Sequence, residues 1–135
     1  MNDAATGTCL CGAVTFRITG PFQGFFLCHC ARCRKDSGSA HSANLFSTTA
    51  KIEWLSGKEN IRQFLLSGTR HMKCFCTTCG SGLPFFQDNE GLLVVPAGSL
   101  DSPISIRPNA HICHASRANW DNDLSFVDRI DGLPG

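Results

Sequence analysis

Residues 28–34 read Cys28-His29-Cys30-Ala31-Arg32-Cys33-Arg34, so three thiols lie within six residues beside basic side chains. Two further motifs carry paired cysteines, Cys9-Leu10-Cys11 upstream and Cys76-Thr77-Thr78-Cys79 downstream. Seven of the nine cysteines therefore belong to three short motifs. Cysteines clustered in this way in a reducing compartment are more typical of metal sites than of disulfides, and an odd total fits a disulfide framework poorly. We predict that the motifs bind zinc.

The composition indicates one globular domain over residues 1–135. Hydrophobic residues make up 42% of the chain and charged residues 17%, with 12 basic side chains against 11 acidic ones. This balance argues against a nucleic-acid partner, which would require a basic surface. No stretch approaches the roughly 20 apolar residues of a membrane-spanning helix, and the first six residues lack the basic and apolar regions of a secretory leader. We therefore expect a cytoplasmic protein without a membrane partner.

Short apolar runs alternate with turn residues along most of the chain, which predicts a mainly β domain. We expect two strands within residues 6–19, others at 25–27, 42–46, 52–55, 61–66, 70–75, 83–87, 92–95, 104–107 and 111–114, and a turn at 88–91. After Cys30 the sequence favours one or two helical turns that end at Gly38. From Ala115 onward the chain is predicted to be irregular, with Trp120 and Phe126 as packing anchors.

The seven clustered cysteines divide into four plus three, because a structural zinc takes four ligands and a catalytic zinc usually keeps one position open. In one partition, Cys9, Cys11, Cys76 and Cys79 form the closed site, and Cys28, Cys30 and Cys33 form the open one. In the other, the pairs 30/33 and 76/79 form a zinc-ribbon site and leave the remaining three. We favour the first partition, because Gly80 suits a zinc knuckle and the basic pair after Cys33 suits the start of a helix.

Three motifs occur in order along the chain: Gly-x-Cys-x-Cys-Gly at 7–12, Cys-His-Cys-x-x-Cys-Arg at 28–34 and Phe-Cys-x-x-Cys-Gly at 75–80. They are followed by Ala97-Gly98-Ser99-Leu100-Asp101, Pro108-x-x-His111-Ile112, Ser116-Arg117 and Trp120. This series resembles the glutathione-dependent formaldehyde-activating enzyme family, the one that includes centromere protein V. The resemblance covers about residues 7–134 and so implies a single zinc-binding domain of that type.

The resemblance implies a Mss4-like fold of small antiparallel sheets with zinc sites and one short helix. It also implies a structural zinc at Cys9, Cys11, Cys76 and Cys79 and a second, more labile zinc at Cys28, Cys30 and Cys33. The activity that it implies is that of a carbon–sulfur lyase, which joins formaldehyde to glutathione as S-hydroxymethylglutathione.

An open zinc site would take the thiol of a substrate such as glutathione as its fourth ligand and deprotonate it. Within the triad we expect Cys30 to be the most reactive thiolate, because basic residues and His29 flank it. Candidate substrate contacts are the basic side chains near the triad, His41 after the helix, and two residues of the C-terminal motif. They are Arg32, Arg34, Lys35, His41, Arg117 and Trp120.

Other chemistry-bearing residues are expected to have ordinary roles. In a strand, His29 points away from the thiols on either side of it, so we expect it to pack or to form hydrogen bonds. We also expect structural roles for His111 and His114, which bracket Cys113, and a buried or free thiol for Cys74. Two other functions remain open: a thiol-binding module without turnover, and a structural zinc domain that binds a protein partner. An open triad argues against the second of these, because a scaffold needs no unfilled zinc position.

Overall fold

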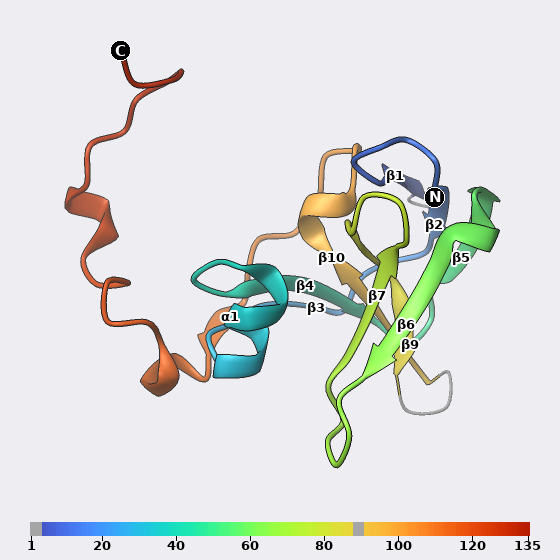
Figure 1. Cartoon of the computed structure of the whole chain (residues 1–135), viewed down its shortest axis with the longest axis horizontal. Coiled ribbons are helices and arrows are strands. Elements are labelled where there is room, and N and C mark those ends of the chain that lie inside the picture. The colour runs from blue at the N-terminus through green and yellow to red at the C-terminus, as the bar shows by residue number, and fades with distance from the viewer. Residues whose placement is uncertain (1–3, 88–90) are drawn as a thin grey trace.

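The computed structural model describes residues 4–87 and 91–135, and the predicted turn at 88–91 falls largely outside these ranges. Within them the chain forms three small sheets and one α-helix (Figure 1). The first sheet has the order β1-β2-β5, with β1 at Ala4–Thr8, β2 at Thr15–Thr19 and β5 at Lys51–Ser56. The second has the order β11-β3-β4-β10-β9, with β3 at Gly24–Cys28, β4 at Ser42–Ser47, β9 at Phe85–Gln87, β10 at Leu92–Pro96 and β11 at Ala110–Ile112. The third is β6-β7-β8, at Ile61–Leu65, Met72–Cys76 and Gly82–Leu83.

One continuous core joins the three sheets. Phe16 of the first sheet, Leu45 of the second and Leu83 of the third are fully buried and belong to the same apolar cluster. Each such side chain contributes about 1.5–3 kcal/mol through its burial. The packing leaves no room at Gly7, where an added Cβ would overlap Cζ of Phe16 and would lie 2.6 Å from the carbonyl oxygen of Ser99. This shared core therefore fixes the turn after β1 relative to the turn after β7, and both turns carry cysteines.

The helix α1 spans Ala31–Ser37 and follows β3 directly. Cys30 is its N-cap, and Gly38 ends it in the left-handed conformation at φ 67°, as the sequence predicts. The backbone N–H of Gly38 donates to the carbonyl of Arg34 over 2.8 Å, which satisfies one of the carbonyls left free at a helix end. No helix in the described part of the chain is long and apolar enough to span a membrane.

The mainly β prediction is confirmed, and its errors lie near prolines and in the C-terminal segment. Pro84 separates β8 from β9 where one strand was expected, and residues 104–107 form no strand. Ile104 and Ile106 do pack against the core, but prolines at 103 and 108 remove backbone donors on both sides. The strand β11 is shorter than expected and pairs in parallel with β3, whereas the other strand pairs are antiparallel in the described residues.

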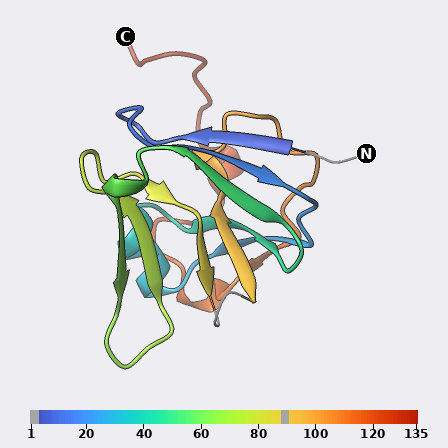
Figure 2. The ribbon, with the colours of Figure 1, turned by 90° about the vertical axis from the view of Figure 1, so that its right-hand side faces the viewer.

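The expectation that Trp120 and Phe126 anchor the tail is wrong. Their side chains are 58% and 85% exposed. After β11 the chain stays against the body as far as Asp121, which lies 3.0 Å from His29, and its C-terminal end then extends away from the body (Figures 1 and 2). Its local structure consists of short 3-10 turns at His114–Ser116 and Leu124–Phe126. Two aromatic side chains on such a segment have no sheet face within reach to cover them.

Candidate metal centre

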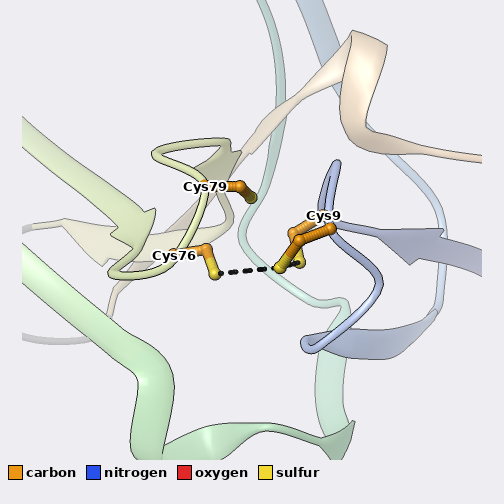
Figure 3. A group of neighbouring side chains, drawn as sticks. Cys9, Cys76 and Cys79 are labelled. Atoms are coloured by element: carbon orange, nitrogen blue, oxygen red, sulfur yellow. Dashed lines mark hydrogen bonds between the residues drawn. The ribbon is translucent and has the colours of Figure 1, made fainter.

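The first cysteine cluster joins two turns that are far apart in sequence. The turn after β1 contributes Cys9 and Cys11, and the end of β7 with the following turn contributes Cys76 and Cys79. Their four Sγ atoms all lie within 4.8 Å of one another, and the thiols of Cys9, Cys76 and Cys79 point toward a common centre (Figure 3). Gly80 adopts φ 77° and its N–H donates to the carbonyl of Cys76 over 2.7 Å, which is the tight turn that the glycine predicts.

The geometry of this cluster fits a tetrahedral zinc ion. Thiolates bound at the usual 2.3 Å would place their sulfurs about 3.8 Å apart. The recorded Sγ–Sγ distances are 3.6 Å from Cys9 to Cys11 and 3.9 Å from Cys11 to Cys76. Hydrogen bonds from the hydroxyl and backbone of Ser81 lower the pKa of Cys79 to about 5. The cluster thus already favours the thiolate form at one position, which is the form that binds metal.

The second cluster consists of Cys28 at the end of β3, Cys30 at the helix N-cap and Cys33 in its first turn, with Sγ atoms within 4.8 Å of one another. The structure therefore groups the cysteines as in the first partition, and their service as metal ligands stays a prediction. Burial raises the pKa of Cys28 and, more strongly, that of Cys33. Burial also acts against ionisation of Cys30, but hydrogen bonds led by the backbone N–H of Cys33 prevail and lower its pKa.

A cavity of about 800 Å³ opens beside this triad and is lined by Cys28 and Cys33, while Cys30 is not among its lining residues. Its walls come from α1, β4, β7, β8, β10 and the 3-10 turn at Ala97–Ser99. Its volume falls within the range of small-molecule sites, about 300–1,000 Å³. Because Cys28 and Cys33 lie on its wall, a metal bound by the triad would be at the cavity surface.

Three charged or titratable side chains form a network on the cavity wall. Asp36 of α1 accepts a hydrogen bond at Oδ1 from Nζ of Lys73, over 2.7 Å, and Nζ also donates to the Asp36 carbonyl over 2.8 Å. Its Oδ2 lies 2.8 Å from Nε2 of His71. All three residues line the cavity. Apart from the thiols, they are the titratable side chains among its described lining residues, and Lys73 is its cation.

The predicted substrate contacts lie elsewhere. Arg32, Arg34, Lys35, His41, Arg117 and Trp120 are absent from the lining of this cavity. Arg34 Nε and His41 Nδ1 are buried and form no hydrogen bond in the described part of the chain. Cys74 is buried as expected and lines the cavity, and its burial raises the pKa of its thiol to about 11. The roles of the six residues in binding stay predictions.

A cluster of histidines behind the triad was missed by the sequence analysis. His29 is 1% exposed; its Nε2 lies 2.8 Å from Nδ1 of His111, and its Nδ1 lies 3.0 Å from Oδ2 of Asp121. The rings of His41 and His114 lie 5.0 and 5.2 Å from that of His29. The cluster ties the segment between Cys28 and Cys30 to β11 and to the start of the tail. The parallel pairing of β11 with β3 brings His111 next to His29. The spacing of the histidines in the sequence does not predict this contact.

Comparisons with known proteins bear on both the fold and the family of this chain. The family model described as "Glutathione-dependent formaldehyde-activating enzyme" matches residues 4–116. A curated protein of Halomonas elongata, named "Putative glutathione-dependent formaldehyde-activating enzyme", is 32% identical over 124 residues, which cover 84% of this chain and 77% of the relative. A crystal structure of a Rhodobacter sphaeroides protein matches with a TM-score of 0.57 over 78% of this chain and 98% of that chain. At 20% identity this last match supports the fold alone.

Proposed function

This chain belongs to the glutathione-dependent formaldehyde-activating enzyme family, and on that premise we propose that it is a zinc-dependent carbon–sulfur lyase-type enzyme. Its substrate would be the adduct of glutathione and formaldehyde, S-hydroxymethylglutathione, or a related small thiol adduct. The observation that carries the proposal is the position of the three-thiol cluster, which presents Cys28 and Cys33 on the wall of the cavity. The four-thiol cluster would hold a structural zinc, and the three-thiol cluster a second, labile or catalytic one.

The open position at the triad has a chemical use. Zinc bound there would lower the pKa of a substrate thiol that takes the fourth position and so supply a thiolate at neutral pH. The sulfur of such a substrate would attack the carbonyl carbon of formaldehyde, and a C–S bond would form. The carbonyl π pair moves to oxygen, which takes up the proton that the thiol released, so the hydroxymethyl adduct is formed without a further reactant. The reverse reaction breaks the same C–S bond.

The cavity wall supplies recognition of the rest of the substrate. Glutathione carries carboxylates, and Lys73 is the cation on the described lining. Two of its three N–H donors are used by Asp36, and the third is free to meet a carboxylate. Asp36 also fixes the direction of the Lys73 side chain, because it accepts at both its carbonyl and its carboxylate. Lys73 on β7 would thus bind a carboxylate of the substrate while the substrate thiol binds at the triad.

The test measures exchange between free glutathione and its hydroxymethyl adduct by NMR, in glutathione–formaldehyde mixtures with and without protein. We expect a rate above the uncatalysed background, and we expect Cys30→Ser to lower both this rate and the zinc content. Cys113→Ser is the matched control, because Cys113 is exposed and belongs to neither cluster. A rate at background, with glutathione still bound, would leave a binding module and refute the enzyme. Unchanged zinc and thiol binding in Cys30→Ser would remove the triad from the mechanism.

A further inference from the structure

The five-stranded sheet carries apolar side chains on both of its faces. Leu45 of β4 and Leu93 of β10 belong to the core cluster. Phe46 and Val94, the next residues along these strands, point to the opposite face and do not belong to that cluster. Both line the cavity. The second face of an antiparallel sheet is usually polar where it meets water, so an apolar second face indicates a surface that binds an apolar group.

The apolar side chains on this face form a row across three strands. Val94 of β10 pairs with Phe46 of β4 on one side and with Phe85 of β9 on the other. Residues paired in this way have their side chains on the same face of the sheet, and all three line the cavity. Met72 of β7 also lines the cavity and is only partly buried. The apolar row, defined as Phe46, Val94 and Phe85, therefore forms part of the cavity floor.

The apolar row and the three-thiol cluster lie at opposite ends of one sheet face. Cys28 of β3 pairs with Ser42 of β4, and both residues line the cavity. On the same face of β4, Asn44 comes next and Phe46 follows it. At about 3.3 Å per residue, Phe46 lies roughly 13 Å along the strand from Ser42. A sulfur bound beside Cys28 is thus separated from the apolar row by the polar position of Asn44.

The adduct of glutathione with formaldehyde has no group that uses the apolar row. Glutathione is a polar tripeptide, and the hydroxymethyl group on its sulfur is too short to leave the triad. The charged network of Asp36, His71 and Lys73 belongs to α1 and β7, whereas the apolar row belongs to β4, β9 and β10. The cavity therefore offers charged groups for a peptide-like thiol and, on other strands, an apolar surface for a different part of the substrate.

We propose that the cavity binds the adducts that glutathione or a related thiol forms with apolar aldehydes, and that the apolar row holds the hydrocarbon group of the aldehyde. This inference rests on the proposed function and names its substrate class. The thiol sulfur adds to the carbonyl carbon of the aldehyde, a C–S bond forms, and the carbonyl oxygen takes the proton that the thiol releases. Each methylene group buried against the row should tighten binding by about fourfold.

The first experiment measures binding to the full chain by calorimetric titration with two stable thioethers, S-methylglutathione and S-hexylglutathione. We expect the hexyl probe to bind at least about tenfold more tightly. Phe46→Asn should remove most of this difference and leave the affinity for the methyl probe unchanged. Phe126→Asn is the matched control, because Phe126 is exposed and does not line the cavity. Equal affinities of the two probes for the wild type overturn the proposal.

A second variant covers the case in which Phe46→Asn does not fold, which circular dichroism checks. Met72→Gln keeps the length of a partly exposed side chain outside the core cluster, and it should also reduce the preference for the hexyl probe. A preference that is unchanged in every folded variant means that the hexyl group binds away from the apolar row, and this refutes the assignment.

The second experiment separates this inference from the proposed function. NMR exchange is followed in mixtures of glutathione with formaldehyde or with hexanal, and each rate is divided by its own uncatalysed rate. We expect a larger enhancement for hexanal, and we expect Phe46→Asn to lower this enhancement more than that for formaldehyde. Enhancement that is equal for both aldehydes, or limited to formaldehyde, refutes the inference and leaves the lyase. A preference for the hexyl probe without turnover of either aldehyde refutes the lyase and supports the apolar class of ligand.

Discussion

Replacing Lys73 with methionine tests whether the cavity recognises the anionic part of a thiol substrate. The ammonium group forms two hydrogen bonds with Asp36, at 2.7 and 2.8 Å, and the two side chains are 30% and 22% exposed. A hydrogen bond to a charged group contributes about 1.5–3 kcal/mol, and partial exposure places the loss here at about 1–2 kcal/mol. The melting temperature should then fall by roughly 3–10 °C. His71 still holds one oxygen of Asp36, so the fold should survive.

The effect on binding should be separable from this loss of stability. Losing one charge-assisted hydrogen bond to a substrate carboxylate should raise the dissociation constant of glutathione roughly tenfold or more. An uncharged thiol such as mercaptoethanol should bind both forms equally. Calorimetric titration with both thiols measures this, Lys73→Arg should recover most of the affinity, and Lys51→Met on the exposed edge of β5 is the matched control. If Lys73→Met lowers the melting temperature but binds glutathione like the wild type, Lys73 is only structural and the reasoning fails.

Three other changes probe the framework around the site. Cys79→Ser should lower the melting temperature far more than Cys30→Ser in a differential scanning experiment, because only the four-thiol cluster joins two sheets; equal losses would contradict this. Gly7→Ala should cost about 1–3 kcal/mol or more in chemical denaturation, because its methyl group would meet a fully buried ring and a carbonyl oxygen; wild-type stability would show that the strand pair can shift. Asp121→Ala should cost about 1–3 kcal/mol, because it removes the carboxylate whose Oδ2 lies 3.0 Å from the buried Nδ1 of His29, and an unchanged denaturation midpoint would mean that this contact does not stabilise the fold.

Local patterns were enough to predict much of this architecture. The helix after Cys30 and its end at Gly38 follow from capping chemistry that acts over a few residues. The strand β2 at Thr15–Thr19 follows from local alternation, whereas β1 begins at Ala4, before the predicted range, and residues 9–14 form a loop between the two strands. The grouping of seven cysteines into four and three follows from motif spacing together with the glycine after Cys79. The helix depends on interactions close in sequence, and each cysteine motif is short, although the four-cysteine group joins motifs 65 residues apart.

The rest depends on contacts between distant segments. The cavity wall at Lys73 could not be predicted, because its partner Asp36 lies 37 residues away on α1, and basic residues nearer the triad were the obvious candidates. The histidine cluster requires the parallel pairing of β11 with β3, which a reading of alternation and turns does not anticipate. The exposed positions of Trp120 and Phe126 contradict the usual preference of large aromatic residues for a core, and composition alone does not reveal that the segment carrying them lies outside the sheets.

The two cysteine clusters differ in what they connect, and this difference supports their different proposed roles. The four-thiol cluster brings residues 9–11 together with residues 76–79 and so links the first sheet to the third. A metal bound there would restrain the chain between residues 11 and 76, and the folding free energy would then depend on it. The triad spans only residues 28–33, whose path β3 and α1 already determine. A metal bound there adds little to the fold, so it can exchange ligands without unfolding the chain. Two of these three thiols, those of Cys28 and Cys33, also line the large cavity, where ligand exchange is useful.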